Sequence, residues 1–151
     1  MRRIYLVFSC LVIAVFLIAG TAPSRSANRS HVGTLTCTVA PSTQPQALES
    51  RELSCVYEPI AGMKGTFDGT VNRLGGTAPT ADQLVLVWLV LAEEPIVSMH
   101  ELEGRYVGVI SNGSGELASG EVALQPMSAL PGGTQNFAPL VLELDLKMLK
   151  A

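Results

Sequence analysis

The stretch Thr34-Leu35-Thr36-Cys37-Thr38-Val39 alternates strictly between small polar and apolar side chains. A period of two, built from β-branched residues, predicts a β-strand with one buried face. Residues 53–57 (Leu-Ser-Cys-Val-Tyr) repeat the pattern and carry a cysteine on their own apolar face. Antiparallel pairing of these two strands brings the Cβ atoms of Cys37 and Cys55 within bonding distance. The two segments thus predict neighbouring strands joined by a disulfide.

The N-terminus predicts a cleavable export signal. Arg2 and Arg3 precede the apolar run 4–20, and a small, polar stretch follows it. A charged start, an apolar run and a small-residue cut region are the three parts of a secretory signal. The alternative is an uncleaved membrane anchor, which needs about 20 apolar residues, so this run is at the short limit. We expect a signal peptide at 1–26 and a single β domain at 27–151, periplasmic or secreted.

The charge of the predicted domain excludes some partners. Removal of residues 1–26 leaves 7 basic and 13 acidic residues, a net charge of −6. Nucleic-acid binding needs clustered positive charge to neutralise phosphates, so we expect no nucleic-acid partner. The same sign argues against docking on anionic lipid. Membrane contact is therefore expected only transiently, through the signal peptide.

Cys37 and Cys55 are the two cysteines of the predicted domain. An even pair in an oxidising compartment predicts a disulfide. Zinc binding is the alternative, but two thiolates without a nearby pair of histidines do not complete a zinc site. In the chain-entropy model, closing this loop stabilises the fold by about 3 kcal/mol.

Other segments have strand character and are separated by turn signals. Asn112-Gly113 predicts a hairpin turn, and residues 95–103 predict a short helical turn or lid. The further expected strands are residues 65–71, 84–91, 105–111, 116–125 (bent at Gly120) and 140–148. Together the segments predict an all-β antiparallel β-sandwich or small β-barrel of about seven to eight strands with one disulfide.

Residues 84–91 are apolar without interruption, which is typical of a strand buried on both faces. We favour a core strand covered by a neighbouring segment, because large apolar patches are uncommon on soluble monomers. The alternative is an outer face that meets a partner, a ligand or a second copy of the chain. Two aromatic residues, Trp88 and Tyr106, either line an apolar ligand pocket or pack the core. For Trp88 we favour packing against the disulfide.

No set of residues predicts catalysis. The chain has two histidines, His31 and His100. His100-Glu101-Leu102-Glu103 lacks a second histidine for a metal and a nucleophile for acid–base work. Gly113-Ser114-Gly115 lacks the outer glycines of a nucleophile elbow. We therefore expect a protein that is not an enzyme, with no catalytic, cofactor-binding or metal-binding residues and no cofactor.

Several of these segments, in this order, resemble one family of exported proteins, known as domain of unknown function 992. The matching segments are Gly33–Cys37, Leu53–Cys55, Leu86–Trp88, Leu102–Gly108 and Leu124–Ser128. The glycine-rich stretch before the last segment is shorter here than in that family. The resemblance implies an exported two-cysteine domain and brings no activity or catalytic residues with it.

Two functions fit these expectations. The first is a binding module for a protein, a glycan or a small apolar ligand. The alternative is a structural, envelope-associated protein that self-associates through residues 84–91. A ligand cavity would favour the first, and a two-fold interface on that strand would favour the second.

Overall fold

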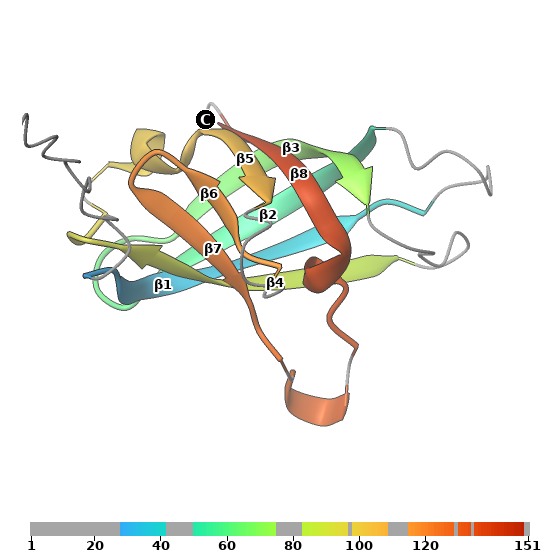
Figure 1. Cartoon of the computed structure of the whole chain (residues 1–151), viewed down its shortest axis with the longest axis horizontal. Coiled ribbons are helices and arrows are strands. Elements are labelled where there is room, and N and C mark those ends of the chain that lie inside the picture. The colour runs from blue at the N-terminus through green and yellow to red at the C-terminus, as the bar shows by residue number, and fades with distance from the viewer. Residues whose placement is uncertain are drawn as a thin grey trace, which may run out of the picture.

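Antiparallel strands close into a barrel in the computed structural model of the chain (Figure 1). The structure describes residues 28–41, 50–74, 83–96, 98–108, 115–128, 130–133 and 135–149. Within these ranges the strands are β1 (Ser30–Val39), β2 (Arg51–Pro59), β3 (Gly65–Leu74), β4 (Leu84–Ala92), β5 (Gly104–Gly108), β6 (Leu117–Ser119), β7 (Val122–Pro126) and β8 (Val141–Met148). The predicted signal peptide lies outside the described residues.

The strands follow one another around the barrel in the order β1-β2-β3-β8-β5-β6-β7-β4. The ring closes where β4 pairs with β1, with Leu35 opposite Trp88. This confirms the expected all-β antiparallel fold with about eight strands, and the barrel is the architecture adopted. Closure pairs each strand on both sides, which removes the exposed edges that an open sheet leaves.

The described ranges also contain three short 3-10 helices in the connections between strands: η2 (Met99–Leu102), η4 (Pro131–Gly133) and η5 (Ala138–Leu140). The first is the helical turn expected within 95–103, and Ser98 caps it through a capping box with Glu101. Leu102 at its end is fully buried. The part of the chain that the structure describes contains no helix long and apolar enough to cross a membrane.

The strict alternation in the sequence produces the barrel core. Inward-facing side chains of β1 and β2 are almost completely buried, while their outward neighbours are half-buried or exposed. β4 adds Leu84, Leu86, Trp88 and Val90 to the same interior cluster. Side chains therefore fill the barrel, as they do in other small eight-stranded barrels.

Two glycines allow bulky neighbours to pack in the barrel wall. A Cβ atom at Gly33 would lie 2.4 Å from the Tyr57 ring, which covers this glycine. A Cβ atom at Gly69 would lie 2.3 Å from the backbone oxygen of Asp145 on β8. Neither position accepts a larger side chain without movement, since real Cβ contacts are not this short.

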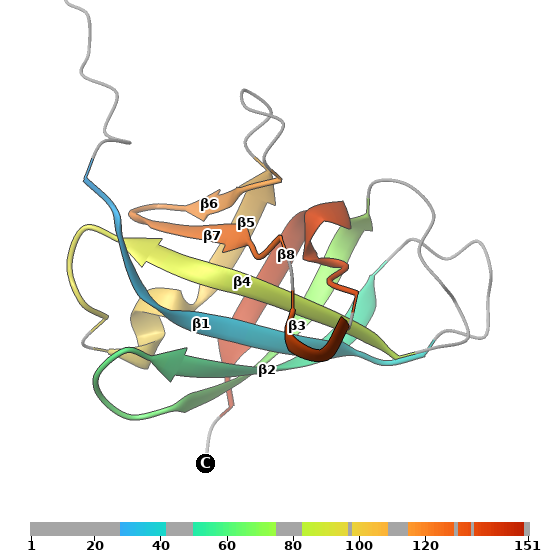
Figure 2. The same ribbon diagram turned by 90° about the horizontal axis from the view of Figure 1, so that it is seen from below.

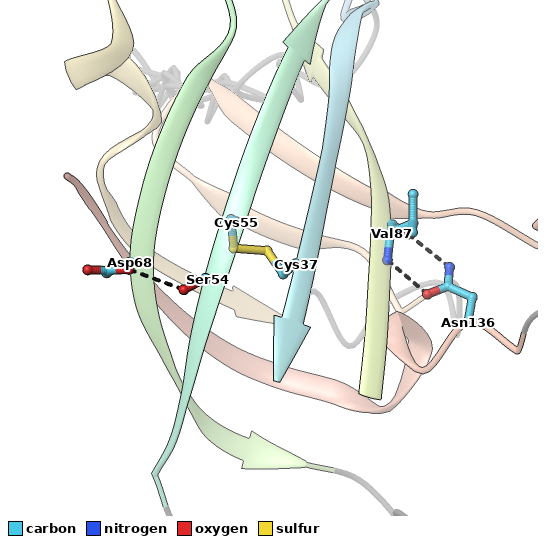
Figure 3. The surroundings of a disulfide bond; sticks show 6 residues. All are labelled: Cys37, Ser54, Cys55, Asp68, Val87 and Asn136. Atoms are coloured by element: carbon cyan, nitrogen blue, oxygen red, sulfur yellow. Dashed lines mark hydrogen bonds between the residues drawn. A yellow bond between two sulfur atoms is a disulfide. The ribbon is translucent and has the colours of Figure 1, made fainter. Parts of the chain in front are cut away.

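Beyond the last paired residues of β4 and β7, the side chain of Asn136 forms hydrogen bonds with the backbone of β4 (Figure 3). Its Nδ2 donates to the Val87 oxygen at 2.9 Å, and its Oδ1 accepts from the Val87 nitrogen at 2.9 Å. The same amide also bonds to the backbone of Met127 and Ala138. Asn136 therefore pairs with the Val87 N–H group and gives the Val87 carbonyl a second donor, beside the Met127 nitrogen at 3.2 Å.

One strand expectation was wrong. Residues 116–125 were expected as a single strand bent at Gly120, but they contain a hairpin in which Ser119 pairs with Val122. Gly120 has φ +57°, a conformation that glycine adopts freely at the first position of a two-residue hairpin turn. The expected Asn112-Gly113 turn lies outside the described residues, but the strands on either side, β5 and β6, do pair antiparallel.

The burial of Tyr106 predicts that the barrel is sensitive to alkali. Its hydroxyl donates to the Leu102 carbonyl at 3.0 Å, and burial raises its pKa well above the ordinary 10. Burial, and then the charge of Glu101, also raise the pKa of Tyr57. Above pH 10 the unfolded chain loses tyrosine protons that the folded chain keeps, so the free energy of unfolding falls as the pH rises.

We therefore expect unfolding and tyrosine ionisation to occur together in an alkaline titration. Absorbance near 295 nm and far-UV circular dichroism should change in one transition above pH 10. The titration uses protein without residues 1–26, and so without Tyr5. Tyrosinate that forms while the circular dichroism keeps its native form would contradict the burial of Tyr57 or Tyr106.

Candidate functional site

The predicted disulfide is present inside the barrel (Figure 3). Cys37 on β1 and Cys55 on β2 are directly opposite each other in the strand register, and both are almost completely buried. The bond joins two residues 18 positions apart in the sequence. It therefore fixes the β1–β2 pair from within and is shielded from solvent.

Trp88 and Tyr106 are also fully buried and belong to the same core cluster as the disulfide. The indole Nε1 of Trp88 has no hydrogen-bond partner among the described residues. Neither aromatic residue lines the hollow on β1, β2, β3 and β8 or the hollow beside η2. Both side chains thus take part in packing the barrel core.

A groove lies on the outer face of four adjacent strands, β1, β2, β3 and β8. Its volume is about 520 Å³. The strand register places its outward side chains in two rows that run across the strands. The first row is Thr38, Ser54, Asp68 and Lys147, and the second row is Glu52, Thr70 and Asp145. We call these seven residues and the space between them the polar groove.

The two rows are spaced as the sheet dictates. Adjacent strands lie about 4.8 Å apart, and outward residues two positions apart lie about 7 Å apart along a strand. Ser54 Oγ donates to Asp68 Oδ1 at 3.4 Å, on the opposite side of the sheet from the disulfide (Figure 3). Asn72 Nδ2 donates to Asp145. Neighbouring side chains thus orient two of the three carboxylates.

The polar groove offers both donors and acceptors. Carboxylates come from Glu52, Asp68 and Asp145, and an ammonium comes from Lys147. Ser54 contacts a carboxylate, not an imidazole, so it lacks the histidine base of a serine nucleophile. No group of three or more His, Cys, Asp or Glu side chains suited to a metal occurs in the described ranges.

The second hollow lies at one end of the barrel, where the β2–β3 turn, η2 and the end of β8 meet. His100 lies there, and its Nδ1 is 2.7 Å from the Glu103 carboxylate. His31 is exposed in β1 opposite Leu91 and is not among the residues that line this hollow. Of the two histidines, only His100 therefore lines the hollow.

The apolar strand β4 is covered on its outer face at one position. Alternation directs Val87 outward, yet it is only 6% exposed, because the β7–β8 connection is bonded to it. Val85, Leu89 and Leu91 on the same face are half-buried. Self-association through residues 84–91 would have to use these three side chains.

The polar groove was not predicted from the sequence. Its residues occupy solvent-facing positions of strands whose pairing is long-range, such as β3 with β8. A period of two identifies which side chains face outward but not which strands become neighbours. The only sequence signal for the groove was the alternation of polar with apolar residues. Any half-exposed strand shows this alternation, so it does not identify a binding site.

Comparison with known proteins gives one family. The model of the family described as "Protein of unknown function (DUF992)" matches residues 16–147. No curated protein and no solved structure matches the chain. The match spans both disulfide cysteines, all of β1 to β7 and β8 as far as Lys147, and it confirms the resemblance seen in the ordered sequence segments. The chain belongs to the DUF992 family of proteins of unknown function.

Proposed function

We propose that this protein is an exported, non-enzymatic binding protein and that its polar groove binds a glycan. The observation that carries the proposal is the pair of cross-strand rows of hydroxyl, carboxylate and ammonium groups on one outer face. A mixed set of donors and acceptors matches neutral sugar hydroxyls, each of which both donates and accepts. The three carboxylates disfavour an anionic ligand.

The filled interior supports a site on the outside. A small apolar ligand needs an apolar cavity, and side chains such as Trp88, Tyr57 and Phe67 are fully buried where such a cavity would lie. A protein partner is less favoured at the groove, because the cores of protein interfaces are depleted in charged residues. A glycan therefore fits best of the three ligand classes considered.

Export is supported by the N-terminal pattern and by the disulfide, since such bonds persist in oxidising compartments. We expect the intact mass of protein recovered from the cell envelope or the medium to lack residues 1–26. A mass that includes those residues would contradict cleavage and would favour the alternative, an uncleaved membrane anchor.

Glycan binding predicts a specific loss when the groove carboxylates are neutralised. The double substitution Asp68→Asn and Asp145→Asn keeps the shape but weakens two charge-assisted hydrogen bonds. Each such bond contributes about 1.5–3 kcal/mol, so we expect affinity to fall about tenfold or more. Binding to a panel of neutral and acidic oligosaccharides, followed by calorimetry on the best ligand, measures this change.

The matched control is Glu121→Gln, which makes the same chemical change at an exposed residue of the β6–β7 turn. This variant should bind like the unaltered protein. Failure of the unaltered protein to retain any glycan, or equal losses in both variants, would contradict the site. Recovery of a shortened glycan would contradict the non-enzymatic part of the proposal, because paired carboxylates also catalyse glycoside hydrolysis.

A further inference from the structure

Three methionines from three separate parts of the chain meet in the second hollow, which has a volume of about 420 Å³. Met63 lies in the β2–β3 turn, Met99 in η2 and Met148 at the end of β8. His100 lines the same hollow. We call these four residues the methionine site. It lies beyond Pro59, the last residue of β2, whereas the polar groove begins near the other end of that strand.

Contacts with the barrel fix the positions of two of the three methionine side chains. A Cβ atom at Gly65 would lie 2.5 Å from Met99 Sδ, so this sulfur rests against the bare backbone of β3. Met148 is opposite Phe67 in the strand register and packs on the core. Met63 is 84% exposed in its turn, where burial contributes little to stability. Met63 lines the same hollow as the two anchored thioethers while gaining little from packing.

Glu103 orients the imidazole of His100. Its Oε2 is 2.7 Å from His100 Nδ1, and its Oε1 accepts from the Met148 nitrogen at 2.7 Å. A neutral imidazole that donates from Nδ1 to a carboxylate keeps its lone pair on Nε2. One carboxylate thus ties the histidine to the strand that carries Met148. This is the arrangement that orients histidine ligands in metal sites.

The donor set selects the metal. Thioethers are soft ligands that favour Cu(I) and similar ions, while zinc, calcium and magnesium prefer thiolate, imidazole or oxygen ligands in other combinations. The thiols of Cys37 and Cys55 are consumed by their buried disulfide. Lys64, the cationic residue of the hollow, is paired with Glu58. We propose that the methionine site binds Cu(I) through the three thioether sulfurs and His100 Nε2.

Competition with a coloured Cu(I) chelator tests the proposal. Purified protein receives one equivalent of Cu(I) in the absence of oxygen, with bicinchoninate as competitor. Cys10 lies outside the described residues and is changed to serine in each protein tested, so that a thiol cannot bind the metal. We expect the unaltered site to withdraw one equivalent of copper, and all copper left with the chelator would overturn the proposal.

Methionine-to-leucine substitutions locate the metal, because they conserve volume and leave the fold intact. The triple variant Met63→Leu, Met99→Leu and Met148→Leu should leave all copper with the chelator. Met127→Leu is the matched control, since Met127 lies outside the hollow, where its nitrogen bonds to Val87. Equal losses in the control and the triple variant would overturn the assignment.

Titration with Ag(I), followed by NMR of the methionine methyl groups, tests each methionine of the site separately. The chain has five methionines. Silver nitrate supplies Ag(I), a soft ion that needs no reductant, and the methionine methyl groups are followed by NMR. We expect the methyl signals of Met63, Met99 and Met148 to shift together up to one equivalent while that of Met127 stays in place. Shifts that are equal at all sites, or absent, would contradict the site.

Glu103→Gln tests the positioning of the imidazole. The amide oxygen of the new side chain can still accept from the Met148 nitrogen, but its NH₂ group then faces His100 Nδ1. The imidazole must accept there, which places its proton on Nε2 and removes the lone pair that would bind the metal. We expect affinity for Cu(I) to fall about 10–100-fold while the three methyl groups still respond to silver. Unchanged affinity would remove His100 from the site.

Discussion

Replacing Cys37 and Cys55 together with alanine should lower the free energy of unfolding by about 3–5 kcal/mol. The disulfide closes a loop between residues 18 apart, and in the chain-entropy model the loss of that constraint alone costs about 3 kcal/mol. Both sulfurs are also buried in the core, so the substitution removes packing as well. Urea unfolding followed by circular dichroism measures the change.

The variant should still form the barrel. β1 and β2 lie side by side in the barrel wall (Figure 2). Seven register pairs join them, and the disulfide lies within that ladder. Its far-UV spectrum without denaturant should therefore match that of the unaltered protein. The matched control is Thr36→Ala with Val56→Ala, the neighbouring pair in the register, which faces outward. Cross-strand pairs contribute about 0.2–1 kcal/mol, so this control should lose much less.

An equal loss in the two double variants would mean that the disulfide adds nothing beyond an ordinary cross-strand pair. A free thiol at either cysteine, labelled in native protein without reductant, would contradict the bond itself. Both outcomes can be separated from a failure to fold, because the circular dichroism of each variant is measured first.

Local patterns in the sequence predicted the faces of the strands well. Period-two alternation in β1 and β2 identified the buried positions, and the two cysteines on those faces predicted their own pairing. The uninterrupted apolar run of β4 indicated a strand buried on both sides, which holds fully at Val87 and in part at its outward neighbours. These predictions hold because burial of a side chain in a strand depends on local alternation.

The remaining features depend on contacts between distant segments. The barrel, as opposed to a sandwich, results from the pairing of β8 with both β3 and β5, and alternation does not specify partners. Asn136 completes the β4 ladder with a side chain, so no strand pattern marks it. The polar groove and the methionine site each collect residues from three or more segments, and only the folded chain brings those together.

Substitution of Trp88 by alanine should be as costly as loss of the disulfide. The side chain is fully buried at the centre of β4 and joins the core that fills the barrel. Removing a buried tryptophan costs about 3–5 kcal/mol, because the cavity left behind relaxes only in part. Trp88 is the single tryptophan, so circular dichroism in urea must replace fluorescence as the measurement.

Trp88→Phe separates the ring from its polar atom. The indole Nε1 has no partner among the described residues, and an unpaired buried N–H group costs about 1–3 kcal/mol. Both variants lose this N–H group, but phenylalanine keeps a ring in the core, so the phenylalanine variant should be clearly more stable than the alanine variant and only slightly less stable than the unaltered protein. A phenylalanine variant far less stable than the unaltered protein would mean that the indole nitrogen makes a stabilising hydrogen bond.

Leu89→Ala on the same strand is the control, because Leu89 faces outward and is half-buried. A core role for Trp88 requires that the alanine variant at 88 lose far more stability than this one. If the two variants lose the same amount, the interior is not closely packed around the indole and has room for a ligand. In that case a small apolar compound should restore stability to the Trp88→Ala protein, and the binding site would be inside the barrel, not in the groove outside it.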